Sequence, residues 1–243
     1  MQTFFSQQGE DLFVFKNFIN QKREDGRYLE LGALDGVTYS NTKFFQDHLR
    51  FKGVLIEPLP SAYERLSRNR PNDDIYNVAI SSSKEPVSFV GTWATAGMTS
   101  VMADSFKDTH HANAEEYQVN SMPLGEVLRD SGVTYLDLFC LDVEGGELEV
   151  LKTMDWTIPV YVLCVELDGH NEEKDEGCRQ ILRNNGFIFE QRMCINEFWR
   201  NPNYNRKDLL FVINQDPEEQ QHVFMEPHCI PEIKEGLESY AQK

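Results

Sequence analysis

Acidic residues and glycines stand at the ends of two apolar runs that have the length of β-strands. The run YLEL contains Glu30 and leads into a turn with Gly32 and Gly36, and the run GVLIE ends on Glu57. Glycines at such a turn let the backbone approach a ligand closely. A carboxylate can accept hydrogen bonds from both vicinal hydroxyls of a ribose. These runs therefore indicate a nucleoside cofactor.

The residues between the two glycines favour one kind of cofactor. Their GxxxG spacing lacks the GxGxxG pattern of a nicotinamide dinucleotide site, and Glu30 and Asp35 would repel a pyrophosphate but attract a sulfonium. We therefore predict S-adenosylmethionine as the cofactor. A tight strand-to-helix turn without a ligand is the alternative interpretation. The predicted cofactor residues in this part of the chain are Glu30, Gly32, Ala33, Asp35, Gly36 and Glu57.

Two further acidic segments follow later apolar runs. The segment LDVEGGELEVL carries Asp142 and Glu144, and VELDGH carries Glu166, Asp168 and His170. In a parallel sheet, ligands bind at the carboxyl ends of the strands, and neighbouring strands bring these ends together. We expect these side chains to face one crevice.

Such a crevice could deprotonate a hydroxyl group. Asp142 is the first candidate for the base, with Glu144, Glu166 and Asp168 as supporting carboxylates and His170 as an alternative base. A divalent cation is the other way to relieve the repulsion between carboxylates, and the predicted ligands are Asp142, Glu166 and Asp168. Oxygen ligands favour magnesium or manganese over zinc.

The elements that position these residues alternate along the chain. Apolar runs at 28–31, 53–57, 75–80, 135–142 and 160–167 alternate with helix-like stretches, which predicts a parallel α/β sheet. The runs at 187–195 and 208–214 have only a short connection, so we expect an antiparallel pair. We expect one domain over 1–243. Its N-terminal helical cap covers 1–26, with a helix of about four turns that ends near residue 26.

The segment 86–120 has no clean period after the strand-like VSFV. Irregular stretches of this length are often functional. An acceptor site is one interpretation of its aromatic, methionine and histidine residues, and core or lid packing explains them equally well. These residues are Trp93, Met98, Phe106, His110, His111 and Tyr117.

Composition excludes several classes of function. The net charge of −17 disfavours binding to nucleic acid. No apolar stretch has the length of a membrane span, and the N-terminus has no signal-peptide pattern, so we expect no membrane contact and a cytoplasmic protein. Five cysteines without a CxxC pair predict neither a zinc knuckle nor a disulfide framework. The acidic tail at 215–243 is interpreted as a solvated charge run. The sequence makes no prediction of the oligomeric state.

The chain resembles the FkbM-type methyltransferases, a branch of the class I S-adenosylmethionine-dependent enzymes. The resemblance runs from Phe5 to Ile213. Four segments in order carry it: SQQGEDLFVF, YLELGALDGVTYSNTKFF, GVLIEPLPSAYERLSRNRP and LDLFCLDVEGGELEVLKTMDW.

The resemblance implies a doubly wound, Rossmann-like seven-stranded sheet, mostly parallel, whose last strand is antiparallel. It further implies that Glu30, Gly32 and Gly36 form the cofactor loop, that Glu57 holds the ribose, and that Asp142 to Glu144 stand beside the transferred methyl group. Adenine is implied to lie past the third strand, where this chain has Ala79, Ile80 and Ser81 to Ser83. The family's usual reaction is O-methylation of sugars or secondary metabolites, so the implied acceptor is a small molecule or a glycan.

Three other functions fit parts of the sequence. A nicotinamide-dependent oxidoreductase would share the ribose carboxylate, although the GxGxxG pattern is missing. A catalytically idle binding module could use the acidic crevice for a partner. A metal-dependent hydrolase could use the same carboxylates without S-adenosylmethionine.

Overall fold

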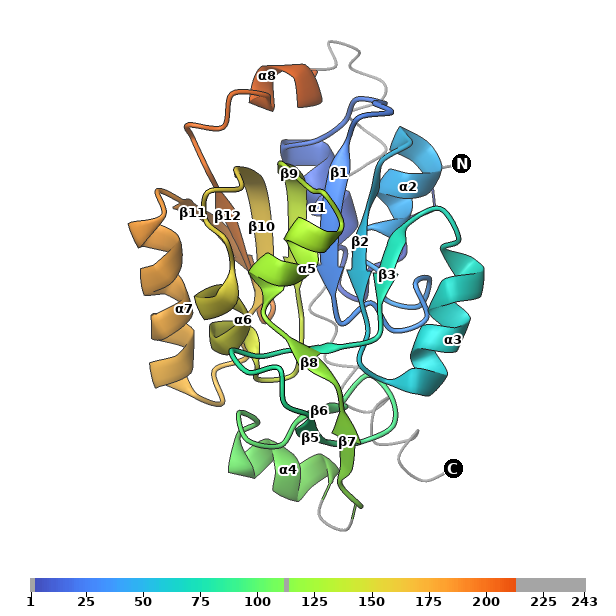
Figure 1. Ribbon diagram of the computed structural model, residues 1–243. Coiled ribbons are helices and arrows are strands. Elements are labelled where there is room, and N and C mark those ends of the chain that lie inside the picture. The colour runs from blue at the N-terminus through green and yellow to red at the C-terminus, as the bar shows by residue number, and fades with distance from the viewer. Residues whose placement is uncertain (1–2, 112–113, 213–243) are drawn as a thin grey trace. The chain divides into compact units, whose positions relative to one another are not determined.

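The computed structural model describes residues 3–111 and 114–212. Its central element is a seven-stranded sheet in the order β11-β12-β10-β9-β1-β2-β3 (Figure 1). The strands of this sheet are β1 (Arg27–Leu31), β2 (Lys52–Ile56), β3 (Asp74–Tyr76), β9 (Leu136–Leu141), β10 (Val160–Glu166), β11 (Ile188–Met193) and β12 (Asn196–Arg200). Strand β12 runs antiparallel to both of its neighbours, and the other pairings are parallel. The predicted α/β fold, with a mostly parallel sheet of seven strands and an antiparallel last strand, is confirmed.

Helices cover both faces of the sheet, as expected for strands buried on both sides. Alternate strand residues point to opposite faces, so Leu29 and Leu31 pack on one side while Tyr28 packs on the other. The first face is covered by α5 (Leu124–Asp130), α6 (Glu147–Thr153) and α7 (Glu172–Asn184). The second face is covered by α1 (Glu10–Asn17), α2 (Lys43–Leu49), α3 (Pro60–Asn69) and α8 (Lys207–Leu210).

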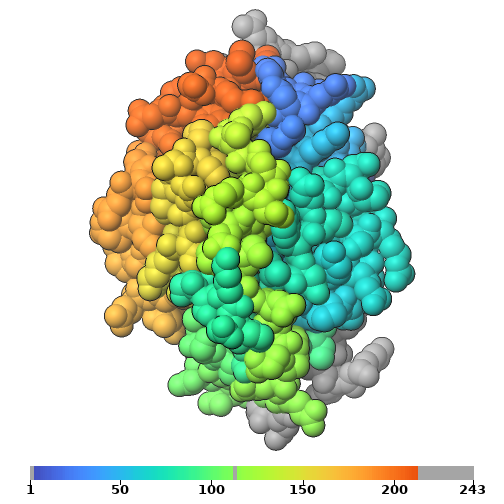
Figure 2. Space-filling model, viewed as in Figure 1, coloured from blue at the N-terminus to red at the C-terminus, as the bar shows by residue number. Residues whose placement is uncertain are grey.

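The segment that lacked a clean period forms a separate layer. It contributes a three-stranded antiparallel sheet in the order β6-β5-β7, and the strands on either side of the segment, β4 and β8, pair with each other in a two-stranded sheet. Figures 1 and 2 show it in green at the lower end of the view, below the large sheet. The segment contains β5 (Val87–Val90), β6 (Gly97–Met98), α4 (Asp104–His110) and β7 (Tyr117–Val119), and it is flanked by β4 (Ala79–Ile80) and β8 (Ser121–Met122).

Three predicted elements differ from the structure. The run 75–80 is divided between β3, which pairs with β2 in the large sheet, and β4, which pairs with β8 outside it. The N-terminal helix has eight residues instead of about four turns, because Phe18 leaves the helical conformation and Asn20 donates its backbone N–H to Leu210. The strand predicted at 208–214 begins as α8, and its last two residues lie outside the described residues. The antiparallel partner of β11 is β12 instead, which follows after a two-residue turn with Cys194 at φ 54°.

Three cysteines, Cys140, Cys164 and Cys178, are free and buried. No helix within the described residues is both long and apolar enough to cross a lipid bilayer. The predicted acidic tail at 215–243 lies outside the described residues.

Candidate cofactor and reaction site

A pocket of about 980 Å³, including the space at its mouth, lies at the carboxyl ends of β1, β2 and β9. Five of the predicted cofactor residues line it: Glu30, Gly32, Glu57, Ala79 and Asp142. This is the edge of an open parallel sheet at which ligands bind, because the strand order reverses there between β1 and β9. The structure thus brings together residues from four separate parts of the chain.

Glu30 is buried at the base of the pocket and has hydrogen-bond donors on both oxygens. The hydroxyls of Ser40 and Thr42 donate to Oε2, and the backbone N–H of Asn41 donates to Oε1. Burial raises the pKa of the Glu30 carboxyl, while the charge of Arg70 and these donors lower it. Glu30 therefore holds the loop between β1 and α2 in place as well as lining the pocket.

Arg70 ties this loop to the end of α3. Its guanidinium is fully buried and donates to the Gly36 carbonyl, to the Tyr28 and Thr42 hydroxyls and to Asp73. Sequence reasoning missed Arg70, because one arginine at the end of a charged helix gives no signal of burial. Its partners come from three other segments, so only the tertiary structure reveals its role.

The remaining loop residues support the turn from outside the pocket. Ala33 is buried in the core. Asp35 accepts hydrogen bonds from the backbone N–H groups of Val37 and Thr38. Gly36 has φ +77°, and a Cβ there would lie 2.6 Å from Arg70 and Leu66 side-chain atoms. None of the three is among the residues that line the pocket.

Gly32 occupies the point where the ends of β1 and β9 approach each other. It has φ +76°, and a Cβ would lie 1.9 Å from the backbone oxygen of Asp142. The neighbouring backbone is fixed as well, since Asp142 donates its N–H to Leu31 and Gly32 donates its N–H to Ile56. Glycine is therefore required at this position by the positive φ and by the contact with Asp142.

Glu57 is a buried carboxylate that follows β2. Its Oε2 accepts the backbone N–H of Leu34 at 2.8 Å, and its Oε1 accepts that of Leu59 at 2.8 Å. A carboxylate oxygen accepts two hydrogen bonds, so each oxygen keeps one site for a ligand. Burial raises the pKa of Glu57 to about 7, against the effect of the two N–H donors. The carboxylate is fixed in orientation and lines the pocket.

The wall beyond Glu57 is apolar. Of the residues named past the third strand, Ala79 and Ile80 of β4 line the pocket, and Ser81 to Ser83 do not. Sequence reasoning did not place Val78 and Phe89 here. Together these side chains form a surface that suits the face of a planar ring.

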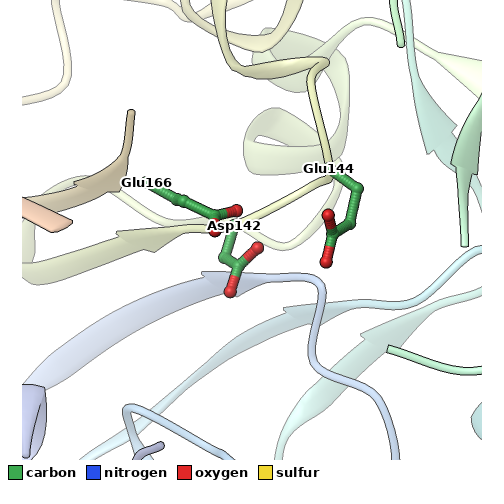
Figure 3. A group of neighbouring side chains, drawn as sticks. All are labelled: Asp142, Glu144 and Glu166. Atoms are coloured by element: carbon green, nitrogen blue, oxygen red, sulfur yellow. The ribbon is translucent and has the colours of Figure 1, made fainter. Parts of the chain in front are cut away.

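Three carboxylates converge at the other end of the pocket (Figure 3). One oxygen each of Asp142, Glu144 and Glu166 lies within 4.8 Å of the others. Burial raises the pKa of all three carboxyls, and their mutual charges raise those of Glu144 and Glu166 further. Asp142 and Glu144 line the pocket itself. The arrangement can hold a proton between carboxyl groups, accept a proton from a ligand or offer oxygens to a cation.

The turn after Asp142 is held in an unusual conformation. Glu144 has φ 55°, in the left-handed region that side chains rarely adopt, and Gly145 follows at φ 103°. Glu147 holds this turn, because its Oε1 accepts the backbone N–H groups of Val143 and Gly145. The Nζ of Lys174 donates to the other oxygen of Glu147 at 2.7 Å. Glu147 and Lys174 are supporting residues that sequence reasoning missed.

Asp168 and His170 face a smaller cavity beside the main pocket. Glu144 and Lys174 line this second cavity too, together with Phe106 of α4. The Oδ1 of Asp168 accepts the backbone N–H of His170 and lies 3.9 Å from Lys174 Nζ. The structure thus places these two predicted catalytic residues next to the carboxylate group rather than in it. Of the three predicted cation ligands, Asp142 and Glu166 lie close together and Asp168 does not. The third carboxylate beside them is Glu144.

Comparison with known proteins assigns this chain to a family. Residues 30–189, more than half of the chain, match the model of the methyltransferase FkbM domain. The chain belongs to the FkbM methyltransferase family. The family resemblance seen in the sequence is confirmed. A comparison with curated proteins finds no match.

A solved methyltransferase structure shares the fold of this FkbM chain. The methyltransferase FkbM from Methylobacillus flagellatus KT has a TM-score of 0.52 at 13% identity, over 81% of this chain and 48% of that one. This chain therefore spans about half the length of that protein. Fibrillarin from Aeropyrum pernix, solved with bound S-adenosyl-L-methionine, gives a TM-score of 0.44 at 12% identity, over 80% of this chain and 73% of that one.

Proposed function

We propose that this FkbM protein transfers the methyl group of S-adenosylmethionine to a hydroxyl group of a small molecule or glycan. The observation that carries the proposal is Glu57, whose two oxygens are fixed by backbone N–H groups and still have room for two ligand hydroxyls. Methyl transfer is favoured over a nicotinamide-dependent oxidoreductase, a hydrolase or an idle binding module, because the family is one of methyltransferases.

The residues of the pocket fit S-adenosylmethionine from end to end. Glu57 would hold the ribose hydroxyls, and the apolar wall of Ala79 and Ile80 would lie against adenine. Glu30 in β1 and Asp142 after β9 give the pocket negative charge, which suits the ammonium and sulfonium groups. The cofactor supplies an activated methyl group, so the protein needs only to align the acceptor and take one proton.

Asp142 is the proposed base for that proton. It lines the pocket, and burial raises the pKa of its carboxyl, which increases its affinity for a proton. Glu166 and Glu144 would share the proton afterwards, because their carboxyl oxygens lie within 4.8 Å of one of Asp142. A divalent cation bound to the same three carboxylates would instead lower the pKa of the acceptor hydroxyl.

Calorimetric titration with S-adenosylhomocysteine and with NAD tests the proposal. We expect binding of the first compound only, and a loss of about 2 to 4 kcal/mol in Glu57→Ala, because a charge-assisted acceptor is removed. Glu149→Ala is a matched control, since that carboxylate accepts the backbone N–H of Ser82 outside the pocket. Unchanged binding by a folded Glu57→Ala protein would show that the ribose lies elsewhere. Labelled S-adenosylmethionine with a panel of glycans and hydroxylated metabolites then tests the acceptor class.

A further inference from the structure

One wall of the cofactor pocket is a loop at residues 91–98, between β5 and the end of β6. This loop belongs to the segment that lacked a clean period in the sequence. Within the loop, a turn closes with the backbone N–H of Ala96 donating to Trp93 at 2.9 Å. The loop residues that line the pocket are Trp93, Ala94, Ala96 and Met98.

The loop packs on the residues that fix the proposed ribose acceptor. Ala94 and Ala96 contact a cluster that contains the buried side chains of Leu34 and Leu59. The backbone N–H groups of Leu34 and Leu59 are the two donors to Glu57. Displacement of the loop would therefore remove one wall of the pocket and also uncover the support of the Glu57 carboxylate.

Two side chains from later in the chain hold the loop in this place. The Nε2 of His111 lies 2.7 Å from the carbonyl oxygen of Thr95, and because a carbonyl only accepts, this nitrogen carries the hydrogen. The hydroxyl of Tyr117 donates to the carbonyl of Gly91 at 2.9 Å. The two bonds are made near opposite ends of the turn. They connect the loop to the end of α4 and to β7.

The His111 ring also packs closely against the loop backbone at Gly91. Gly91 has φ +94°, and a Cβ there would lie 2.7 Å from Cε1 of His111. The imidazole therefore lies directly against the glycine as well as bonding Thr95. On the other side of the loop, the guanidinium of Arg65 lies 5.0 Å from the centre of the Trp93 ring.

We propose that His111 and Tyr117 are positioning residues that hold loop 91–98 against the bound cofactor and thereby set the rate at which it dissociates. The inference rests on the proposed function, because it takes the ligand of this pocket to be S-adenosylmethionine. Neither side chain lines the pocket, so both hydrogen bonds act through the loop, and the ring of Tyr117 also packs on the cluster of Leu34 and Leu59. Their contribution falls on cofactor release and not on the encounter between cofactor and pocket.

Dissociation of labelled S-adenosylhomocysteine, chased with excess unlabelled compound, tests this role in the full chain. We expect His111→Ala and Tyr117→Phe each to dissociate about three- to tenfold faster, the effect of one hydrogen bond, with association rates unchanged. His111→Gln should restore part of the effect, because an amide N–H can replace the imidazole donor. His110→Ala is the matched control, because that neighbouring imidazole is exposed and contacts Phe106 at a ring distance of 4.5 Å.

Amide hydrogen exchange of residues 92–98 gives a readout that needs no ligand. We expect faster exchange there in His111→Ala and Tyr117→Phe, and unchanged exchange in β1 and β9. Folded variants with unchanged dissociation and exchange would overturn the positioning role while leaving the proposed function intact. A wild-type protein that binds no S-adenosylhomocysteine would overturn both.

Discussion

The two ends of the pocket treat their carboxylates in opposite ways. At the β1 and β2 end, Glu30 and Glu57 receive hydrogen bonds on both oxygens from backbone or hydroxyl donors. At the β9 and β10 end, Asp142, Glu144 and Glu166 face one another (Figure 3). At the first end, each carboxylate oxygen already has a hydrogen-bond donor. At the second end, three carboxylates lie close together and repel one another when ionised.

This difference suggests that the first end binds the cofactor and that the second end takes part in proton transfer. Carboxylates with fixed donors are preorganised acceptors, so they suit a ligand whose hydroxyls always occupy the same place. Carboxylates that repel one another have raised proton affinity, and proton affinity is what a general base requires. We therefore expect changes at the first end to alter cofactor affinity, and changes at the second end to alter turnover.

The largest effect is expected where the two ends touch. Gly32→Val would place a side chain against the backbone oxygen of Asp142 at a positive φ, so we expect loss of cofactor binding and of more than about 3 kcal/mol of folding free energy. Gly132→Val is the control, because Gly132 also has a positive φ but has no atom within 4 Å of its Cβ position. Chemical denaturation and calorimetry measure both. A stable Gly32→Val protein with unchanged affinity would disprove the close junction of the two ends.

The next effect concerns turnover alone. Asp142→Asn should lower kcat by about 10²- to 10⁴-fold, because it removes the general base, and should leave the affinity for S-adenosylhomocysteine nearly unchanged. Asp168→Asn is the comparison, and we expect a smaller loss because Asp168 faces the second cavity. Both are measured on an acceptor identified in the panel. Full turnover in Asp142→Asn would end its assignment as the base.

The same assay separates the carboxylate base from a bound cation. We expect turnover to survive chelation, because the three carboxylates can relieve their repulsion by keeping a proton. Loss of activity with a chelator, followed by recovery with magnesium or manganese, would instead establish a cation at Asp142, Glu144 and Glu166.

A smaller effect should appear in the pH dependence of binding. The pKa of Glu57 is raised to about 7, so its carboxyl is protonated in the unliganded pocket at lower pH. The ionised form is the stronger acceptor, so the affinity for S-adenosylhomocysteine should fall as pH decreases below 7, by at most about tenfold per pH unit. Affinity should be level above that range. Titrations from pH 5.5 to 8.5 should show this slope in the wild type, whereas Glu57→Gln should bind weakly without it.

The smallest effect concerns stability at the acidic end. Burial and the charges of Asp142 and Glu144 raise the pKa of Glu166 above its unfolded value. Its stabilising contribution is therefore present below the unfolded pKa and lost as pH rises. Glu166→Gln should then raise the free energy of unfolding by about 1 kcal/mol at pH 8 and have no such benefit at pH 4. Glu173→Gln, on the exposed face of α7, is the control. A Glu166→Gln protein that is less stable at pH 8 would contradict the mutual repulsion.

Much of the first end of the pocket could be predicted from the sequence. Glu57 and Gly32 follow short apolar runs directly, and the strand boundaries there agree with the runs to within a residue. Partners brought by the tertiary structure could not be predicted. Arg70 and Lys174 look like ordinary helix charges, because nothing in their neighbourhood in the sequence shows that other segments bury them.

The end of the chain shows a different reason for failure. A short apolar run such as 208–214 fits a strand and a buried helix equally well. The real partner of β11 begins at Asn196, after a turn without glycine or asparagine at its two central positions, so no hairpin signal is present. The sequence placed Asp142, Glu144 and Glu166 in one crevice, and their carboxylates do lie together. It also placed Asp168 there, but the Asp168 carboxylate lies near Lys174 instead.

The hydrogen bond from Asp142 to Leu31 joins two strands that are far apart in the chain. A contact of such long sequence separation closes a large loop, and this costs conformational entropy that a local contact does not cost. The pocket therefore has no local precursor, and a fragment that ends before β9 would contain Glu30 and Glu57 without a reaction site. Cofactor binding should then report on completion of the central sheet, and added ligand should stabilise the whole sheet by mass action.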